Sequence, residues 1–145
     1  MRAMLALFAS ALAAAPASAD ATWIPGGEVR AAFTRGAPLL ETAAYKVHAS
    51  RRTAPGEAEI HVRDTDLIYV LEGSATLVTG GTLVGGRDVA PGELRGASIE
   101  GGDARALAPG DVVVVPHGTP HWFREVDGPL LYYVVKVTAP SEPGR

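Results

Sequence analysis

The chain has 145 residues and no cysteine, and its 16 acidic and 13 basic side chains give a formal net charge of −3. This length supports one domain, and the absence of a basic excess argues against nucleic acid as a partner. Without cysteine there is no disulfide and no thiolate ligand, so a metal would have to be held by histidine or by oxygen.

The first 19 residues are predicted to be a secretory signal peptide. Arg2 supplies the positive start, residues 3–15 form an apolar run, and residues 17–19 (Ala-Ser-Ala) match a cleavage site. The run is too short for a bilayer span, which needs about 20 residues; a buried N-terminal helix is the alternative. We therefore expect residues 20–145 to form a single domain, periplasmic or secreted, without membrane contact after signal removal.

The chain is predicted to be mostly β structure after the signal peptide, because many of its 17 glycines and 11 prolines separate short apolar, β-branched runs. Residues 28–33 favour one or two helical turns before the breaker at residues 36–38. Eight or more short strands with frequent turns indicate a sandwich or jelly-roll barrel. Strands are expected at residues 45–49, 59–62, 67–71, 74–79, 82–84, 103–107, 112–115, 121–124 and 130–137.

Three segments carry more specific predictions. Residues 82–84 are expected to return beside residues 74–79, because Gly80-Gly81 suits a hairpin turn. Residues 85–100, rich in glycine, proline and charge, are interpreted as a surface loop, with a pocket lid as the alternative. The four valines at residues 112–115 predict a strand buried on both faces.

The stretch from Glu59 to Gly73 holds candidate metal ligands. Glu59 and His61 share one face of a strand by alternation, and Asp66 follows a short polar turn. If the two strands pair, these side chains converge at one end of a hairpin, and His121 is a fourth candidate far along the chain. Taken singly, the residues have simpler interpretations: a surface pair for His61 and Asp66, and turn packing for His121.

Two blocks of the chain resemble the motifs of the cupins. The first is His61-x4-Asp66-x6-Gly73, and the second is Gly110-x5-Pro116-x-Gly118-x2-His121. The chain departs from the family pattern in four places. Glu59 replaces the first motif histidine, Asp66 replaces a glutamate, and Glu125 replaces an asparagine. Thr53 stands where the first motif opens with glycine, and Gly56 comes three residues late. The resemblance implies an all-β, cupin-type double-stranded β-helix with a short N-terminal helical segment and a barrel core over about residues 43–138.

The resemblance also implies that a divalent metal is bound by His61, Asp66 and His121. Glu59 is either a further ligand or a catalytic general base beside the metal. Two histidines and a carboxylate suit Fe(II), and oxygen-rich ligation favours Fe(II) or Mn(II), with Zn or Ni as alternatives. Because aspartate is shorter than glutamate, Asp66 must approach the ion closely or reach it through water.

His48, Phe123 and Lys136 are candidate pocket residues at the barrel mouth. For His48 and Lys136 we favour a solvated strand face, but an inward Lys136 should meet a carboxylate or an anionic ligand, because an unpaired buried charge is costly. The predicted function is that of a metal-dependent enzyme, dioxygenase- or isomerase-like, acting on a small oxygenated organic molecule. A non-catalytic binding or sensing protein is the alternative, and a homodimer formed through edge strands is expected.

Overall fold

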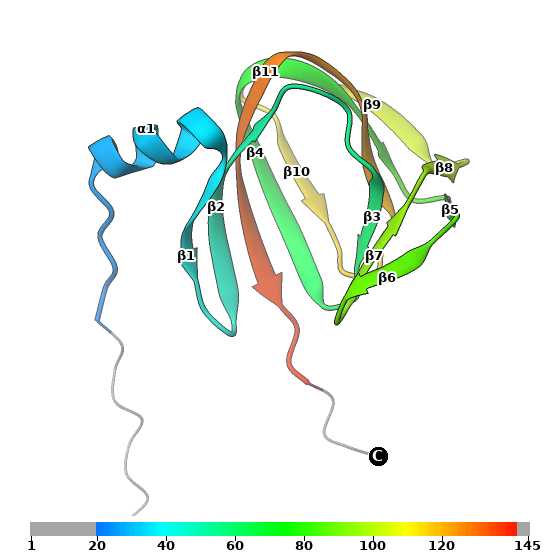
Figure 1. Ribbon diagram of the computed structural model, residues 1–145, viewed down its shortest axis with the longest axis horizontal. Coiled ribbons are helices and arrows are strands. Elements are labelled where there is room, and N and C mark those ends of the chain that lie inside the picture. Colours follow the sequence, from blue (N-terminus) through cyan, green and yellow to red (C-terminus); the bar gives the residue numbers. More distant parts are fainter. Residues whose placement is uncertain (1–19, 142–145) are drawn as a thin grey trace, which may run out of the picture.

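The protein is a curled antiparallel β structure with one short helix (Figure 1). The computed structural model describes residues 20–141, so the predicted signal peptide lies outside the described residues. The elements are α1 (Gly26–Arg35), β1 (Ala37–Glu41), β2 (Tyr45–Arg52), β3 (Ala58–His61), β4 (Asp64–Thr79), β5 (Thr82–Val84), β6 (Arg87–Ala90), β7 (Glu93–Gly96), β8 (Ser98–Glu100), β9 (Asp103–Leu107), β10 (Val112–Val115) and β11 (His121–Thr138).

The two longest strands, β4 and β11, pair antiparallel along most of their length and organise the main sheet. β11 also pairs with β2 and β3, which gives the strand order β1-β2-β11-β3-β7-β6, while β9 and β10 pair with β4. β5 and β8 form a separate two-stranded sheet. The main sheet curls round so that its inner face encloses the core (Figure 1). The predicted all-β barrel is confirmed.

A change of side-chain parity at Gly73 lets β4 bend. Before this glycine the buried positions include Asp66 and Ile68, whereas after it they include Ala75 and Leu77. Gly73 has φ 77°, and a Cβ added there would lie 2.5 Å from the carbonyl oxygen of Pro129. Only glycine suits this conformation and this close approach. Even-numbered residues of β4 such as Asp66 and Ile68 therefore face the core before the bend, and odd-numbered residues such as Ala75 and Leu77 face it after the bend.

β11 changes its inward-facing parity between Phe123 and Val126. His121 and Phe123 are buried in its first part, and Leu130 and Tyr132 in its second part. The pairing of β11 with β4 is irregular between Phe123 and Glu125, where two steps along β11 match one step along β4, as expected for a bulge. Strands were predicted at residues 121–124 and 130–137, and the structure joins them into one bent strand.

The main core fills the inside of the barrel. Its fully buried members include Ile68, Val70, Leu77 and Leu130. α1 packs outside the barrel, where the ring of Phe33 meets that of Tyr133 edge to face at a centroid distance of 5.0 Å. Within residues 20–141, no helix has the length and apolar character required to cross a membrane.

Two expectations about strand pairing are wrong. Residues 85–100 are not a loop, since they contain β6, β7 and β8. β5, at residues 82–84, pairs with β8 and not with β4. β6 and β7 form a hairpin with each other, whereas the β3–β7 and β5–β8 pairings join segments that are not adjacent in sequence.

The predicted burial of residues 112–115 on both faces is also wrong. Val112 and Val114 are 59% and 56% exposed, whereas Val115 is buried. β10 pairs only with β4 among the described residues, and nothing described covers its outer face. The run of valines therefore alternates like an ordinary strand at a sheet edge.

Candidate metal centre

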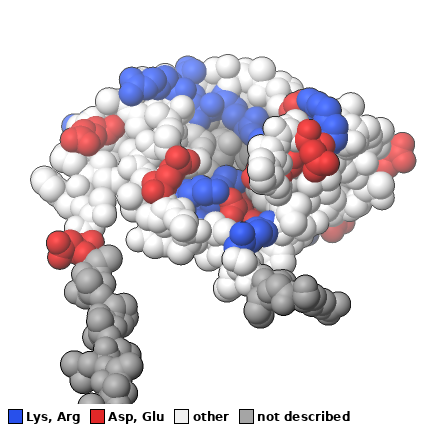
Figure 2. Space-filling model, turned by 60° about the horizontal axis from the view of Figure 1, so that its bottom comes forward, with Lys and Arg blue, Asp and Glu red and all other residues white. Residues whose placement is uncertain are grey.

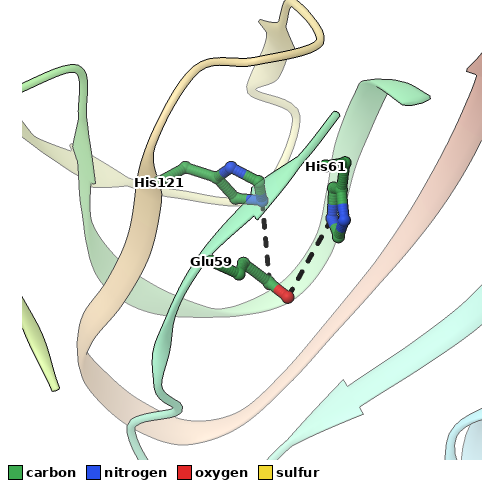
Figure 3. Close-up of side chains that lie close together, drawn as sticks. All are labelled: Glu59, His61 and His121. Atoms are coloured by element: carbon green, nitrogen blue, oxygen red, sulfur yellow. Dashed lines mark ion pairs between the residues drawn. The ribbon is translucent and has the colours of Figure 1, made fainter. Parts of the chain in front are cut away.

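Glu59 and His61 lie on β3 and meet His121 on the neighbouring strand. The register of β3 with β11 places His121 opposite Glu59, so the expected hairpin between residues 59–62 and 67–71 does not form. β3 lies instead between β11 and β7. In Figure 3 the carboxylate of Glu59 points towards both imidazoles. All three side chains are buried, and each offers a ligand atom within 4.8 Å of the others.

Asp66 approaches the same group from β4. One of its oxygens lies 3.4 Å from His61 Nε2 and 3.9 Å from His121 Nε2. Glu59 oxygens lie 3.9 Å from His61 Nε2 and 3.6 Å from His121 Nε2. Because metal–ligand bonds of about 2.1 Å allow two ligands to be up to about 4.2 Å apart, all four separations fit a single ion.

His121 offers an unused nitrogen lone pair at this centre. Its Nδ1 lies 3.1 Å from the carbonyl oxygen of Thr119 and donates to it, which leaves Nε2 unprotonated. Nε2 is buried and has no hydrogen-bond partner among the described residues. Burial lowers the pKa of His121 to about 4, against the opposing effect of the Thr119 carbonyl. The imidazole is therefore neutral at pH 7, as a metal ligand must be.

His61 is oriented by a carboxylate on its far side. The register of β3 with β7 places Glu93 opposite His61, and His61 Nδ1 lies 2.7 Å from a Glu93 oxygen. A carboxylate that accepts from one ring nitrogen fixes the ring and turns the other nitrogen into an acceptor. His61 Nε2 accordingly faces the centre, where Lys136 Nζ donates to it at 2.8 Å.

Asp66 is ionised and tied to Lys136. Lys136 Nζ lies 2.8 and 2.7 Å from its two carboxylate oxygens. Burial alone would raise the pKa of Asp66, but the nearby His61 ring and the charge and hydrogen bonds of Lys136 outweigh burial and hold that pKa below 3.8. Asp66 thus carries a full negative charge beside two imidazoles.

Glu59 is held by two arginines. Arg95 lies opposite it across the β3–β7 pairing and forms an ion pair with it. Arg52 Nη2 lies 3.5 Å from the other Glu59 oxygen. The Arg52 guanidinium also lies over the ring of Phe123, 4.7 Å from its centroid, and donates to the hydroxyl of Tyr132 at 3.0 Å.

The centre opens into a cavity of about 160 Å³ inside the barrel. All three predicted pocket residues line this cavity. The solvated strand face favoured for Lys136 is wrong, because its side chain is only 15% exposed and meets the Asp66 carboxylate. His48 also contacts the exposed carboxylate of Glu41, 2.9 Å away. In Figure 2 the molecule is hollowed, with basic and acidic side chains around the hollow. The cavity is lined by His48, Ser50, Arg52, Glu59, Asp66, Ile68, His121, Phe123, Tyr132, Val134 and Lys136.

Sequence reasoning missed several residues that contact the predicted ligands. Glu93 and Arg95 fall in the segment interpreted as a loop, although the polar–apolar–polar alternation of residues 93–95 is typical of a strand. Arg52 shares the parity of His48 on β2, but the strand was expected to end at Ala49. Lys136 was considered, but its contact with Asp66 depends on pairing between β4 and β11.

A curled β barrel with two imidazoles and two carboxylates on its inner wall defines a double-stranded β-helix protein with a candidate metal site. The family model described as Cupin matches residues 17–143. The chain therefore belongs to the cupin family, whose members commonly bind a divalent metal.

Solved structures share this fold. The DMSP lyase DddQ from Ruegeria pomeroyi DSS-3 is 19% identical with a TM-score of 0.52; the match covers 74% of this chain and 48% of that chain. KdgF from Halomonas sp. is 20% identical with a TM-score of 0.52, covering 72% and 80%. A cupin protein from Bacteroides fragilis is 14% identical with a TM-score of 0.51, covering 76% and 81%.

This chain thus spans about half the length of the DMSP lyase. At identities of 14% to 20% these likenesses establish the fold alone. The comparison with curated proteins found no match.

Proposed function

We propose that the protein is a metal-dependent enzyme acting on a small oxygenated organic molecule inside the barrel. The observation that carries this proposal is the buried, neutral His121, whose Nε2 lacks a hydrogen-bond partner among the described residues and lies 3.6 Å from Glu59 and 3.9 Å from Asp66. Buried polar atoms without partners are rare and call for an explanation. A divalent ion bound by His61, His121 and one or both carboxylates supplies one.

The metal would be Fe(II) or Mn(II) by ligand chemistry, with Zn or Ni as alternatives. When bound, such an ion acts as a Lewis acid on substrate oxygen or supports oxygen chemistry. The chain's own residues hold the ligands in place: Glu93 orients His61, and the Thr119 carbonyl orients His121. Where Glu59 does not ligate the ion, it is a general base beside it.

The charge balance of the centre favours an anionic ligand. The carboxylates of Glu59, Asp66 and Glu93 face the basic groups of Arg52, Arg95 and Lys136, so the metal-free centre is close to neutral. A divalent ion adds two positive charges in a largely buried place, where uncompensated charge is costly. A small carboxylate-bearing substrate would offset part of this charge, and the cavity of about 160 Å³ limits its size.

We also propose that the protein is exported to the periplasm or beyond. The support is the positively charged start, apolar run and Ala-Ser-Ala site of residues 2–19. N-terminal sequencing of the protein expressed with its leader is expected to find Asp20 first. An N-terminus at Met1 in the cell interior would contradict this.

Elemental analysis of the purified protein tests the metal. We expect about one divalent ion per chain in the wild type and loss of that ion in His61→Ala and His121→Ala. His117→Ala is the matched control, because His117 is an exposed turn residue four positions before His121. A folded wild type that retains no ion after incubation with Fe(II), Mn(II), Zn or Ni would refute the proposal.

Activity assays separate an enzyme from a binding protein. Oxygen uptake and product formation would be followed with the metal-loaded protein and a panel of small carboxylic acids. Turnover that disappears in His121→Ala supports the enzyme. Tight ligand binding without turnover in a metal-loaded protein would instead establish a binding or sensing role.

A further inference from the structure

The ammonium group of Lys136 lies among the atoms that would ligate the metal. Nζ is 2.8 Å from His61 Nε2 and 2.7 and 2.8 Å from the oxygens of Asp66. The side chain is only 15% exposed. Lys136 thus donates hydrogen bonds to His61 and Asp66, and the atoms that accept them are the same atoms that would bind the metal.

These contacts are incompatible with simultaneous metal ligation by the same atoms. The single lone pair of His61 Nε2 accepts either a hydrogen bond from Lys136 or a bond to a metal. The Asp66 carboxylate has more than one acceptor position, but a divalent ion and an ammonium group a few ångströms apart repel each other strongly in a buried site. One cation must give way to the other.

We infer that Lys136 is an internal competitor of the divalent ion, which stabilises the metal-free centre and weakens metal binding. The inference rests on the metal binding proposed above. It explains how two carboxylates and two imidazoles remain buried without an ion: Lys136 neutralises Asp66, as Arg95 and Arg52 neutralise Glu59. Metal binding then requires displacement of the ammonium group from His61.

The test compares Lys136→Met with the wild type in two measurements on metal-free protein. In calorimetric titrations with Mn²⁺, the variant is expected to bind about tenfold more tightly or better, because a repelling charge and a competing donor are removed. In thermal melts without metal, the variant is expected to be less stable, because Asp66 loses its partner. The metal-induced rise in Tm should therefore be larger than in the wild type.

Lys46→Met is the matched control. Lys46 lies opposite Lys136 in the β2–β11 register and forms an equivalent ion pair with Asp64, at 2.7 Å. It does not contact the predicted ligands in the interactions that the structure shows. Its removal is expected to change Mn²⁺ affinity by less than about threefold, because that charge is more distant and more exposed.

Lys136→Gln and Lys136→Arg extend the test. Gln removes the charge and is expected to tighten Mn²⁺ binding, whereas Arg keeps the charge and should stay near the wild-type affinity. If the Met and Gln variants fold only with metal, their refolding would be titrated with Mn²⁺ by circular dichroism. Failure to refold at Mn²⁺ concentrations that saturate the wild type would overturn the inference.

The two proposals fail in different ways. A wild type without any Mn²⁺, Fe(II), Zn or Ni affinity removes the proposed function. If the wild type binds Mn²⁺ and the folded Met and Gln variants bind it equally or more weakly, only the inference about Lys136 is refuted. Equal tightening by Lys46→Met would also overturn that role, since a general charge effect would then suffice.

Discussion

His121 is neutral because its surroundings oppose a positive charge. It is 2% exposed, and burial lowers its pKa to about 4 from the ordinary 6.5. The Thr119 carbonyl holds the proton on Nδ1, so the lone pair on Nε2 faces the centre. An imidazole ligand must be neutral and correctly oriented. Burial keeps the ring of His121 neutral, and the Thr119 carbonyl group orients it.

This lowered pKa makes the stability of the metal-free protein depend on pH. Between about pH 4 and 6.5 the unfolded chain binds a proton at His121 that the folded chain does not. Stability should therefore fall as the pH is lowered through this window, by up to roughly 3 kcal/mol from this residue. Urea unfolding in EDTA at several pH values measures the free energy of unfolding, with His121→Gln as the reference that cannot titrate at this position. Parallel curves for the two proteins would contradict the prediction.

At the scale of elements, the bend shared by β4 and β11 assembles the centre. His121 and Lys136 are an odd number of residues apart on β11, so a regular strand would point them to opposite faces. The irregular pairing between Phe123 and Glu125 shifts the parity, and both side chains face inward. The bulge is therefore a requirement for the contact between Lys136 and the predicted ligands.

Gly73 is the position where this bend is most sensitive to substitution. Gly73→Ala is expected to lower the free energy of unfolding by about 3 kcal/mol or more, because it combines an unfavourable positive φ with a clash against Pro129. Gly128→Ala shares the φ of 77°, but its Cβ would meet nothing within 4 Å, so only about 1 kcal/mol is expected. Urea denaturation measures the free energy of unfolding of both variants. Equal losses of stability would rule out a contribution from the clash with Pro129.

At the scale of the molecule, the outer face of β4 and β10 is a candidate contact surface. Leu67, Tyr69, Val112 and Val114 are all exposed there, and they are paired across the two strands as Val112 with Tyr69 and Val114 with Leu67. Contiguous exposed apolar side chains at a sheet edge are typical of association sites. The expected homodimer remains a prediction, and this is the surface that we propose for it.

Light scattering tests the dimer. The wild type is expected to have twice the chain mass, and Val114→Lys should shift it towards the monomer, because a charge would then be buried in the contact. Val89→Lys is the control: Val89 is 48% exposed on β6, another edge strand remote from this surface. A monomeric wild type at all concentrations would refute the dimer, and an equal effect of both substitutions would refute this surface.

Local sequence patterns were enough to predict the strand-rich class and to locate the candidate ligands. Spacing within two motifs located His61, Asp66 and His121, because ligand positions in a strand or tight turn depend on neighbours a few residues away. Strand alternation also put Phe123 on the same face as His121, and both side chains line the cavity.

The surroundings of those ligands depend on contacts between distant parts of the chain. Glu93 and Arg95 reach them through the pairing of β3 with β7, and Lys136 through the pairing of β4 with β11. Neither pairing joins segments that are adjacent in sequence, and the parity of Lys136 relative to His121 depends on the bulge between Phe123 and Glu125. Register and bulges are set by packing between distant strands, so local alternation could identify the ligands but not their partners.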